Sequence, residues 1–193
     1  LALLHQDIRG SPLINIDETP VQVLEEPGRT AKQKSYMWVF KGGAVEKPII
    51  IYQYHPTRFG DVAKLFLESY QGVVLTDAYN GYVFLNDCSG ILHVFCWAHA
   101  RRTFMDVKKA SSSKKTGAAD KALSMIRQLY ALEKFARVRK TTPTQVYELR
   151  QQQAKPILNK FYSWLKKKEK HTPPKSLLGK AVNYCLNQWT GLQ

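Results

Sequence analysis

The stretch LINIDETPVQVL, residues 13–24, predicts a β-strand that carries an acid in its middle. Its apolar and β-branched residues run or alternate as they do in strands, and Asp17 directly follows Ile14, Asn15 and Ile16. A charged side chain inside a buried strand is costly unless it is paired or binds a metal ion. We therefore expect Asp17 to have a partner elsewhere in the chain.

Further strands are predicted on the C-terminal side of this stretch. The runs YMWVF (36–40) and IIIYQY (49–54) are separated by turn-rich segments and predict an antiparallel meander with the first strand. After a helical pattern that ends at Gly72, the short apolar runs VVLT (73–76) and ILHVFC (91–96) predict two more strands. The first of these is wholly apolar, as expected for a buried central strand.

The rest of the chain is predicted to be helical. Helices are expected over residues 97–110 and 118–140, with a linker-like run SSSKKT at 111–116 between them. A further helix is expected from an N-cap at Thr144, with Pro156 kinking or dividing it. A last helix opens at Ser176.

This order of elements predicts an α/β fold with a ribonuclease-H-like mixed sheet, three strands antiparallel and two parallel, followed by a C-terminal all-helical insertion. The predicted division is a catalytic-core region at residues 1–110 and a basic helical region at residues 111–193. In such a sheet the first and fourth strands are neighbours, so Asp17 and Asp77, which directly follows VVLT, are expected to meet.

Two carboxylates so close would repel each other, and a divalent cation removes that conflict. Hard oxygen ligands select Mg²⁺ or Mn²⁺, and such ions support phosphodiester chemistry. A structural alternative exists for each acid, because Asp is common in turns: Asp17 could cap a turn before Pro20, and Asp77 could end a strand before the turn at Asn80 and Gly81.

Charge is distributed unevenly along the chain. The total is +14, but residues 1–100 hold 8 Lys and Arg against 10 Asp and Glu, so the whole positive excess lies in residues 101–193. A basic half favours a polyanionic partner such as DNA, although a Lys-rich solvated surface explains it equally well. No run is apolar enough for a membrane span or a signal peptide, so a cytoplasmic location without a membrane partner is expected.

The cysteines and histidines raise the possibility of zinc. Three widely spread cysteines do not form a disulfide framework. Cys88, His93, Cys96 and His99 have a spacing compatible with zinc ligands. His93 and Cys96, however, lie on opposite faces of a predicted strand, where ligands do not converge easily. No zinc is therefore expected, and Cys96 is interpreted as a small core residue.

Three strings in this order and spacing, IDETPVQVL, TDAYNGY and CWAHARRTF, resemble transposases of the bacterial insertion sequence 66 family. The stretch PKSLLGKAVNYCLNQW near the end extends the resemblance over nearly the whole chain. The resemblance implies a DDE-type catalytic core that uses divalent metal to cut and join DNA. Its DNA partners would be the transposon ends and the target DNA. Any self-association would belong to the full-length protein.

By this resemblance Asp17 and Asp77 are the first and second catalytic carboxylates and metal ligands. His99, in the string Cys-Trp-Ala-His, is expected to contact phosphate or to order the scissile strand, although a helix-start His that packs or caps is as good an interpretation. Arg101 and Arg102 are expected to support the DNA backbone, and Arg58 is a weaker candidate for DNA contact.

The family's third acid is a Glu that follows the LNQW-type helix, and no Asp or Glu occurs here after Glu169. The chain as given is therefore expected to be catalytically impaired and to bind metal weakly, as a fragment of the domain. Two alternatives are a non-catalytic DNA-binding remnant of a decayed element and a zinc-stabilised binding module.

Overall fold

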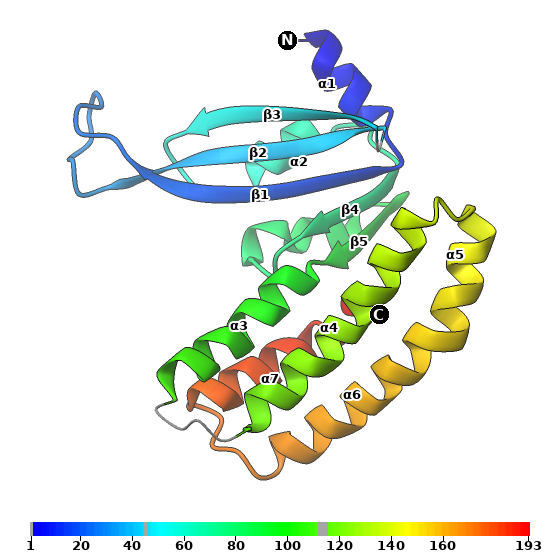
Figure 1. Cartoon of the computed structure of the whole chain (residues 1–193). Coiled ribbons are helices and arrows are strands. Elements are labelled where there is room, and N and C mark those ends of the chain that lie inside the picture. The colour runs from blue at the N-terminus through cyan, green and yellow to red at the C-terminus, as the bar shows by residue number, and fades with distance from the viewer. Residues whose placement is uncertain (1, 45, 112–115) are drawn as a thin grey trace. The chain divides into compact units, whose positions relative to one another are not determined.

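The computed structural model describes residues 2–44, 46–111 and 116–193, which form a mixed α/β structure (Figure 1). The chain divides into two compact units, Leu1–Cys96 and Trp97–Gln193. The first unit contains a five-stranded sheet, and the second is built from helices.

The sheet combines an antiparallel meander with two parallel strands. Its strand order is β3-β2-β1-β4-β5, in which β1 pairs antiparallel with β2, β2 antiparallel with β3, and β4 parallel with both β1 and β5. The predicted meander and the predicted neighbourhood of the first and fourth strands are both confirmed. The strands are β1 (Leu13–Gln22), β2 (Lys34–Ala44), β3 (Lys47–His55), β4 (Gly72–Thr76) and β5 (Ile91–Phe95).

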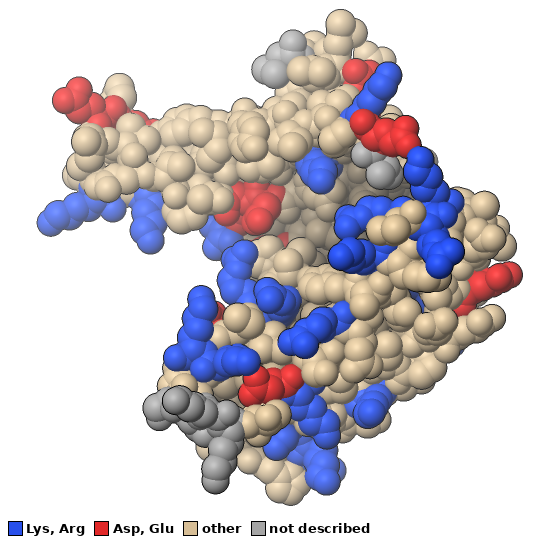
Figure 2. All heavy atoms as spheres, in the orientation of Figure 1, with Lys and Arg blue, Asp and Glu red and all other residues tan. Residues whose placement is uncertain are grey.

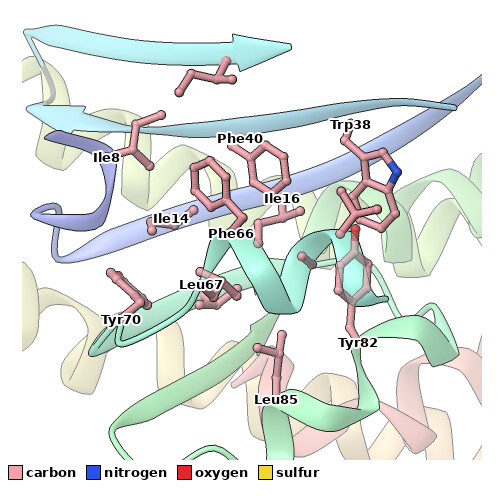
Figure 3. Close-up of a cluster of buried hydrophobic side chains, with 14 residues drawn as sticks. Ile8, Ile14, Ile16, Trp38, Phe40, Phe66, Leu67, Tyr70, Tyr82 and Leu85 are labelled. Atoms are coloured by element: carbon pink, nitrogen blue, oxygen red, sulfur yellow. The ribbon is translucent and has the colours of Figure 1, made fainter. Parts of the chain in front are cut away.

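One face of this sheet carries the core of the first unit (Figure 3). Side chains alternate between the two faces of a strand, so Ile14 and Ile16 point into the core together. Phe40 on β2 stacks on Phe66 with ring centroids 3.7 Å apart. The core is completed from α1 (Ala2–Arg9), α2 (Asp61–Phe66) and the 3₁₀ helix η1 (Asn80–Asp87).

Helix α1 is the element of this unit that sequence reasoning missed. It is short, and it contributes Ile8, whose side chain is fully buried in the core. Its eight residues are too short a stretch for the helical period to be recognised in the sequence.

The second unit packs its helices around a cluster of aromatic rings. Phe161 lies at its centre, fully buried, with ring contacts to Trp97, Phe104, Trp164 and Trp189. The elements are α3 (Trp97–Ala110), α4 (Ala118–Val138), α5 (Pro143–Leu149), the π-helix η2 (Arg150–Ala154), α6 (Lys155–Glu169), α7 (Leu177–Asn187) and α8 (Trp189–Leu192).

The start of α5 corrects one prediction. The N-cap is Thr142, not Thr144: the Thr142 hydroxyl accepts a hydrogen bond from the Gln145 N–H, and the Gln145 side chain bonds back to the Thr142 N–H. Pro143 occupies the first helical position, where its fixed φ suits the helix and its missing N–H costs nothing. A proline just before a threonine therefore belongs inside the helix, and the cap lies before the proline.

The predicted disturbance at Pro156 takes the form of a π turn. The helical path continues through η2, which directly precedes α6, and Pro156 lies in the first turn of α6. A π turn widens the helix locally, which accommodates a residue that lacks the N–H for a regular helical bond.

The division by packing places α3 in the helical unit. The boundary predicted after residue 110 separates the catalytic core from an inserted helical segment. Packing does not test this distinction, so the boundary stays a prediction. Most of the expected linker at 111–116 lies outside the described residues. Among the helices described, none has the length and apolar character required to cross a bilayer.

Candidate active site

The pairing of β1 with β4 brings two acids together at one end of these strands. The strands run parallel, with Ile14 opposite Val74 and Asn15 opposite Leu75. Continuing this register by two residues sets Asp17 beside Asp77. A carboxylate oxygen of Asp17 and one of Asp77 indeed lie within 4.8 Å of each other.

Backbone N–H groups hold both carboxylates. The Glu18 N–H donates to Asp17 Oδ1 at 3.0 Å, and the Tyr79 N–H donates to Asp77 Oδ1 at 2.9 Å. The second contact closes a turn of the kind that Asp favours directly after a strand. Asp17 is exposed and Asp77 is half-buried. The turn role expected of Asp77 thus coexists with its close approach to Asp17, whereas Asp17 caps no turn before Pro20, because β1 continues through both residues.

A buried acid, Glu18, lies next to Asp17 in the chain but on the other face of the sheet. It continues the inward-facing series of Ile14 and Ile16, and its side chain is fully buried. The Tyr82 hydroxyl from η1 donates to its Oε2, and Arg58 donates to its Oε1 at 2.5 Å. Burial raises the pKa of the Glu18 carboxyl, and these two hydrogen bonds oppose that effect.

Arg58 connects this buried acid to the pair of aspartates. Its Nη2 lies 2.5 Å from Glu18 Oε1 and 3.6 Å from Asp77 Oδ2. The guanidinium also stacks on the Tyr79 ring, 3.7 Å from its centroid, and the Arg58 carbonyl accepts a hydrogen bond from the Tyr79 hydroxyl. Arg58 is thus held by the Glu18 carboxylate and by both the ring and the hydroxyl of Tyr79. A cation in this position partly offsets the repulsion between the two aspartates.

Two glycines allow the loops that carry these residues to approach closely. Gly60 lies between Arg58 and α2, and Gly81 lies in η1 after Asp77. A Cβ on Gly60 would fall 2.0 Å from the Gly81 carbonyl oxygen. Any side chain at Gly60 would therefore push the Arg58 loop away from the turn that follows Asp77.

The network of Glu18, Tyr82 and Arg58 was not found by sequence reasoning. The signal for Glu18 was present, because a residue two positions after buried Ile16 in a strand faces the same side. Nothing local in the sequence identifies Tyr82 and Arg58 as its partners, since both lie far along the chain from Glu18.

The remaining predicted site residues lie on α3, in the helical unit. His99 is in the first turn of this helix, two residues after its start at Trp97. Arg101 and Arg102 are both exposed, and they point in different directions because successive residues on a helix are rotated by about 100°. Arg101 lines a groove between α3 and α4. Their expected roles towards DNA stay predictions.

The residues considered as zinc ligands have hydrogen-bonding partners of their own. His93 Nε2 lies 2.8 Å from Thr76 Oγ1, and His93 Nδ1 lies 3.2 Å from Asn86 Oδ1. Burial lowers the pKa of His93. The Cys88 thiol donates to the Phe84 carbonyl. His93 and Phe95 share a strand face, with ring centroids 4.6 Å apart.

Two acids brought together by adjacent parallel strands form a site that can hold a cation, in a mixed α/β unit attached to basic helices. The model of the Transposase IS66 family matches residues 1–193, the entire chain, which therefore belongs to this family.

Curated relatives come from Sinorhizobium fredii. The uncharacterized protein y4jD is 30% identical over 198 residues, which cover 96% of this chain and 37% of that protein. The uncharacterized protein y4qI is 26% identical over 92% of this chain and 34% of its own length. The chain thus spans about a third of the curated relatives it matches. No solved structure matches it significantly.

Proposed function

We propose that this chain is part of the ribonuclease-H-like catalytic domain of a DDE-type transposase, with Asp17 and Asp77 as two of its metal ligands. The observation that carries the proposal is the β1–β4 register, which sets the two carboxylates side by side at the end of adjacent parallel strands. Membership of the Transposase IS66 family supports DNA as the substrate.

The donor set suits a hard divalent cation. Both ligands are carboxylates, whose hard oxygens suit Mg²⁺ or Mn²⁺, and an oxygen of one lies within 4.8 Å of an oxygen of the other. In two-metal phosphodiester chemistry, a pair of such ions would activate the attacking oxygen and stabilise the leaving oxygen. The chain's own contribution is to orient Asp17 and Asp77 through the N–H groups of Glu18 and Tyr79. Two carboxylates supply few of the six ligands that Mg²⁺ prefers, so binding by this pair is weak.

His99, Arg101 and Arg102 support the DNA backbone in this proposal, and they lie together on the first two turns of α3. A second candidate function is non-catalytic DNA binding by a remnant of a decayed element. The excess of basic side chains on the helical unit favours it. Figure 2 shows many of these side chains at the surface. DNA nicking in the presence of Mn²⁺, assayed with the complete domain that includes the third acid, separates the two, because only the transposase proposal expects it.

Metal binding tests the proposal directly. Calorimetric titration with Mn²⁺ is expected to give weak binding to the wild-type chain, reduced about tenfold or more by Asp17→Asn or Asp77→Asn, because each removes one of two charged ligands. Asp87→Asn is the matched control, since Asp87 is an exposed acid at the end of η1 and should leave binding unchanged. Equal effects from all three variants would overturn the assignment of the site.

A further inference from the structure

A groove of about 700 Å³ lies between α3 and α4, within the helical unit. Four charged side chains line it: Arg101 and Lys108 from α3, and Asp120 and Arg127 from α4. The remaining lining residues include a small side chain, Ala98, and an aromatic one, Tyr130. The groove thus combines positive charge with apolar contact surface.

One ion pair sets the register of the two helices. Lys108 Nζ lies 2.6 Å from Asp120 Oδ1, so these positions face each other. α3 and α4 run in opposite directions because they are consecutive packed helices joined by a short connection. Two turns back along α3 from Lys108 lies Arg101, and two turns forward along α4 from Asp120 lies Arg127. Arg101 and Arg127 therefore face each other across the groove.

Arg101 and Arg127 bring two positive charges to this groove. Asp120 is the acid that lines the groove, and Lys108 holds it. Within the described ranges of the chain, neither Arg101 nor Arg127 forms an ion pair. Two facing guanidinium groups repel each other, and an anion between them replaces that repulsion with two attractive contacts. A phosphate suits this position because its oxygens match the planar fork of each arginine.

The same register leaves space beside the arginine pair. Continuing it by one turn sets Ala98 opposite Tyr130, and Tyr130 is 40% exposed. A small residue facing an aromatic ring leaves room for a flat or apolar group. A phosphate that carries a sugar and a base fits this combination better than a free inorganic ion does.

We propose that the α3–α4 groove binds a phosphate of the nucleic-acid backbone between Arg101 and Arg127, with the attached nucleoside against Tyr130. The inference rests on the proposed function in taking DNA as the ligand. It adds Arg127 as a second arginine that contacts the same phosphate as Arg101.

Anisotropy of a fluorescently labelled DNA duplex, measured over a series of salt concentrations, tests this site. Arg101→Ala and Arg127→Ala are each expected to weaken binding about fivefold and to lower the slope of log K against log salt by about one, the value of one lost phosphate contact. Lys121→Ala, an exposed change of equal charge on α4 that does not line the groove, is the matched control and should change affinity less than twofold.

The Arg127→Glu variant distinguishes an effect on DNA binding from an effect on folding. It places a carboxylate opposite Arg101, so the thermal midpoint should be unchanged or higher while DNA affinity falls further than in Arg127→Ala. Loss of affinity together with loss of folding in all groove variants would contradict the proposal, as would groove variants that behave like Lys121→Ala.

Two further outcomes distinguish the ligand source and the underlying function. Inorganic phosphate is expected to compete with DNA for the wild-type protein and not for the Arg127→Glu variant. Thermal stabilisation by inorganic phosphate without any groove-dependent DNA binding would overturn the nucleic-acid assignment. Absence of DNA binding by the wild-type protein would overturn the proposed function itself, whereas wild-type binding with unaffected groove variants would overturn this inference alone.

Discussion

Asp17 and Glu18 are adjacent acids with opposite environments, because successive residues of a strand face opposite sides of the sheet. Asp17 is exposed beside Asp77, whereas the Glu18 side chain is fully buried against Tyr82 and Arg58. A buried carboxylate is tolerated only with partners, and here a hydroxyl and a guanidinium supply them. Because the same guanidinium reaches Asp77, the buried network and the pair of aspartates are electrostatically coupled.

Removing Arg58 should therefore destabilise the fold, because the buried Glu18 carboxylate loses its cationic partner. Arg58→Ala is expected to lower the free energy of unfolding by about 2 kcal/mol, less than for a fully buried pair because the guanidinium is partly exposed. In Arg58→Ala combined with Glu18→Gln, part of this loss should be recovered, since no buried charge is left unpaired. Urea unfolding of both variants measures this, with the exposed Lys64→Ala as control. Additive effects in the double variant would argue against coupling.

At the scale of elements, each helix end depends on a few local hydrogen bonds. The boundaries of α3 agree with the sequence prediction, residues 97–110. The start of α5 does not, because Pro143 shifts the cap to the preceding threonine. The π turn η2 similarly absorbs the effect of Pro156 without ending the helical path.

The cap of α5 can be tested with two neighbouring threonines. Thr142→Ala should lower the free energy of unfolding by about 1 kcal/mol, because the Gln145 N–H loses its side-chain acceptor. Thr144→Ala, at the position that sequence reasoning favoured, should have a much smaller effect and is the matched control. Thermal and urea unfolding measure both, and a larger loss in Thr144→Ala would restore the original assignment.

At the scale of the whole molecule, chemistry and charge are divided between the two units. The first unit contains the paired acids, and residues 101–193 hold all of the positive excess. The helical unit is also where the buried thiol of Cys185 lies, on α7. This thiol can report on the integrity of the unit, because it is accessible only when the helices open.

Burial raises the pKa of Cys185 to about 12, from an ordinary value of 9.0. The folded unit thus retains this proton more tightly than the unfolded chain does, so its contribution to stability is complete below pH 9.0 and is lost as pH rises towards 12. At about pH 8 the group is a buried, neutral thiol, which is unreactive. Iodoacetamide should modify the half-buried Cys88 well before Cys185. Mass spectrometry of the labelled peptides checks this order.

Adding urea should make Cys185 react over the range in which the circular dichroism of the helices is lost. Equal labelling rates for Cys88 and Cys185 in the native protein would show that the core of the helical unit is open to solvent.

The amino-acid sequence by itself determined the order of the strands, the helix over residues 97–110 and the meeting of Asp17 with Asp77. The elements leave local periodic patterns in the chain, and the meeting of the two acids followed from the strand neighbours of a ribonuclease-H-like sheet. It also favoured the family to which the chain belongs.

Only the tertiary structure decided which side chains become partners across the fold. The burial of Glu18 with Arg58 and Tyr82 depends on loops that meet through Gly60 and Gly81. That Arg101 and Arg127 line the same groove depends on the packing of α3 against α4. Such contacts join residues whose separation along the chain carries no periodic signal, so long-range packing, and not local propensity, sets them.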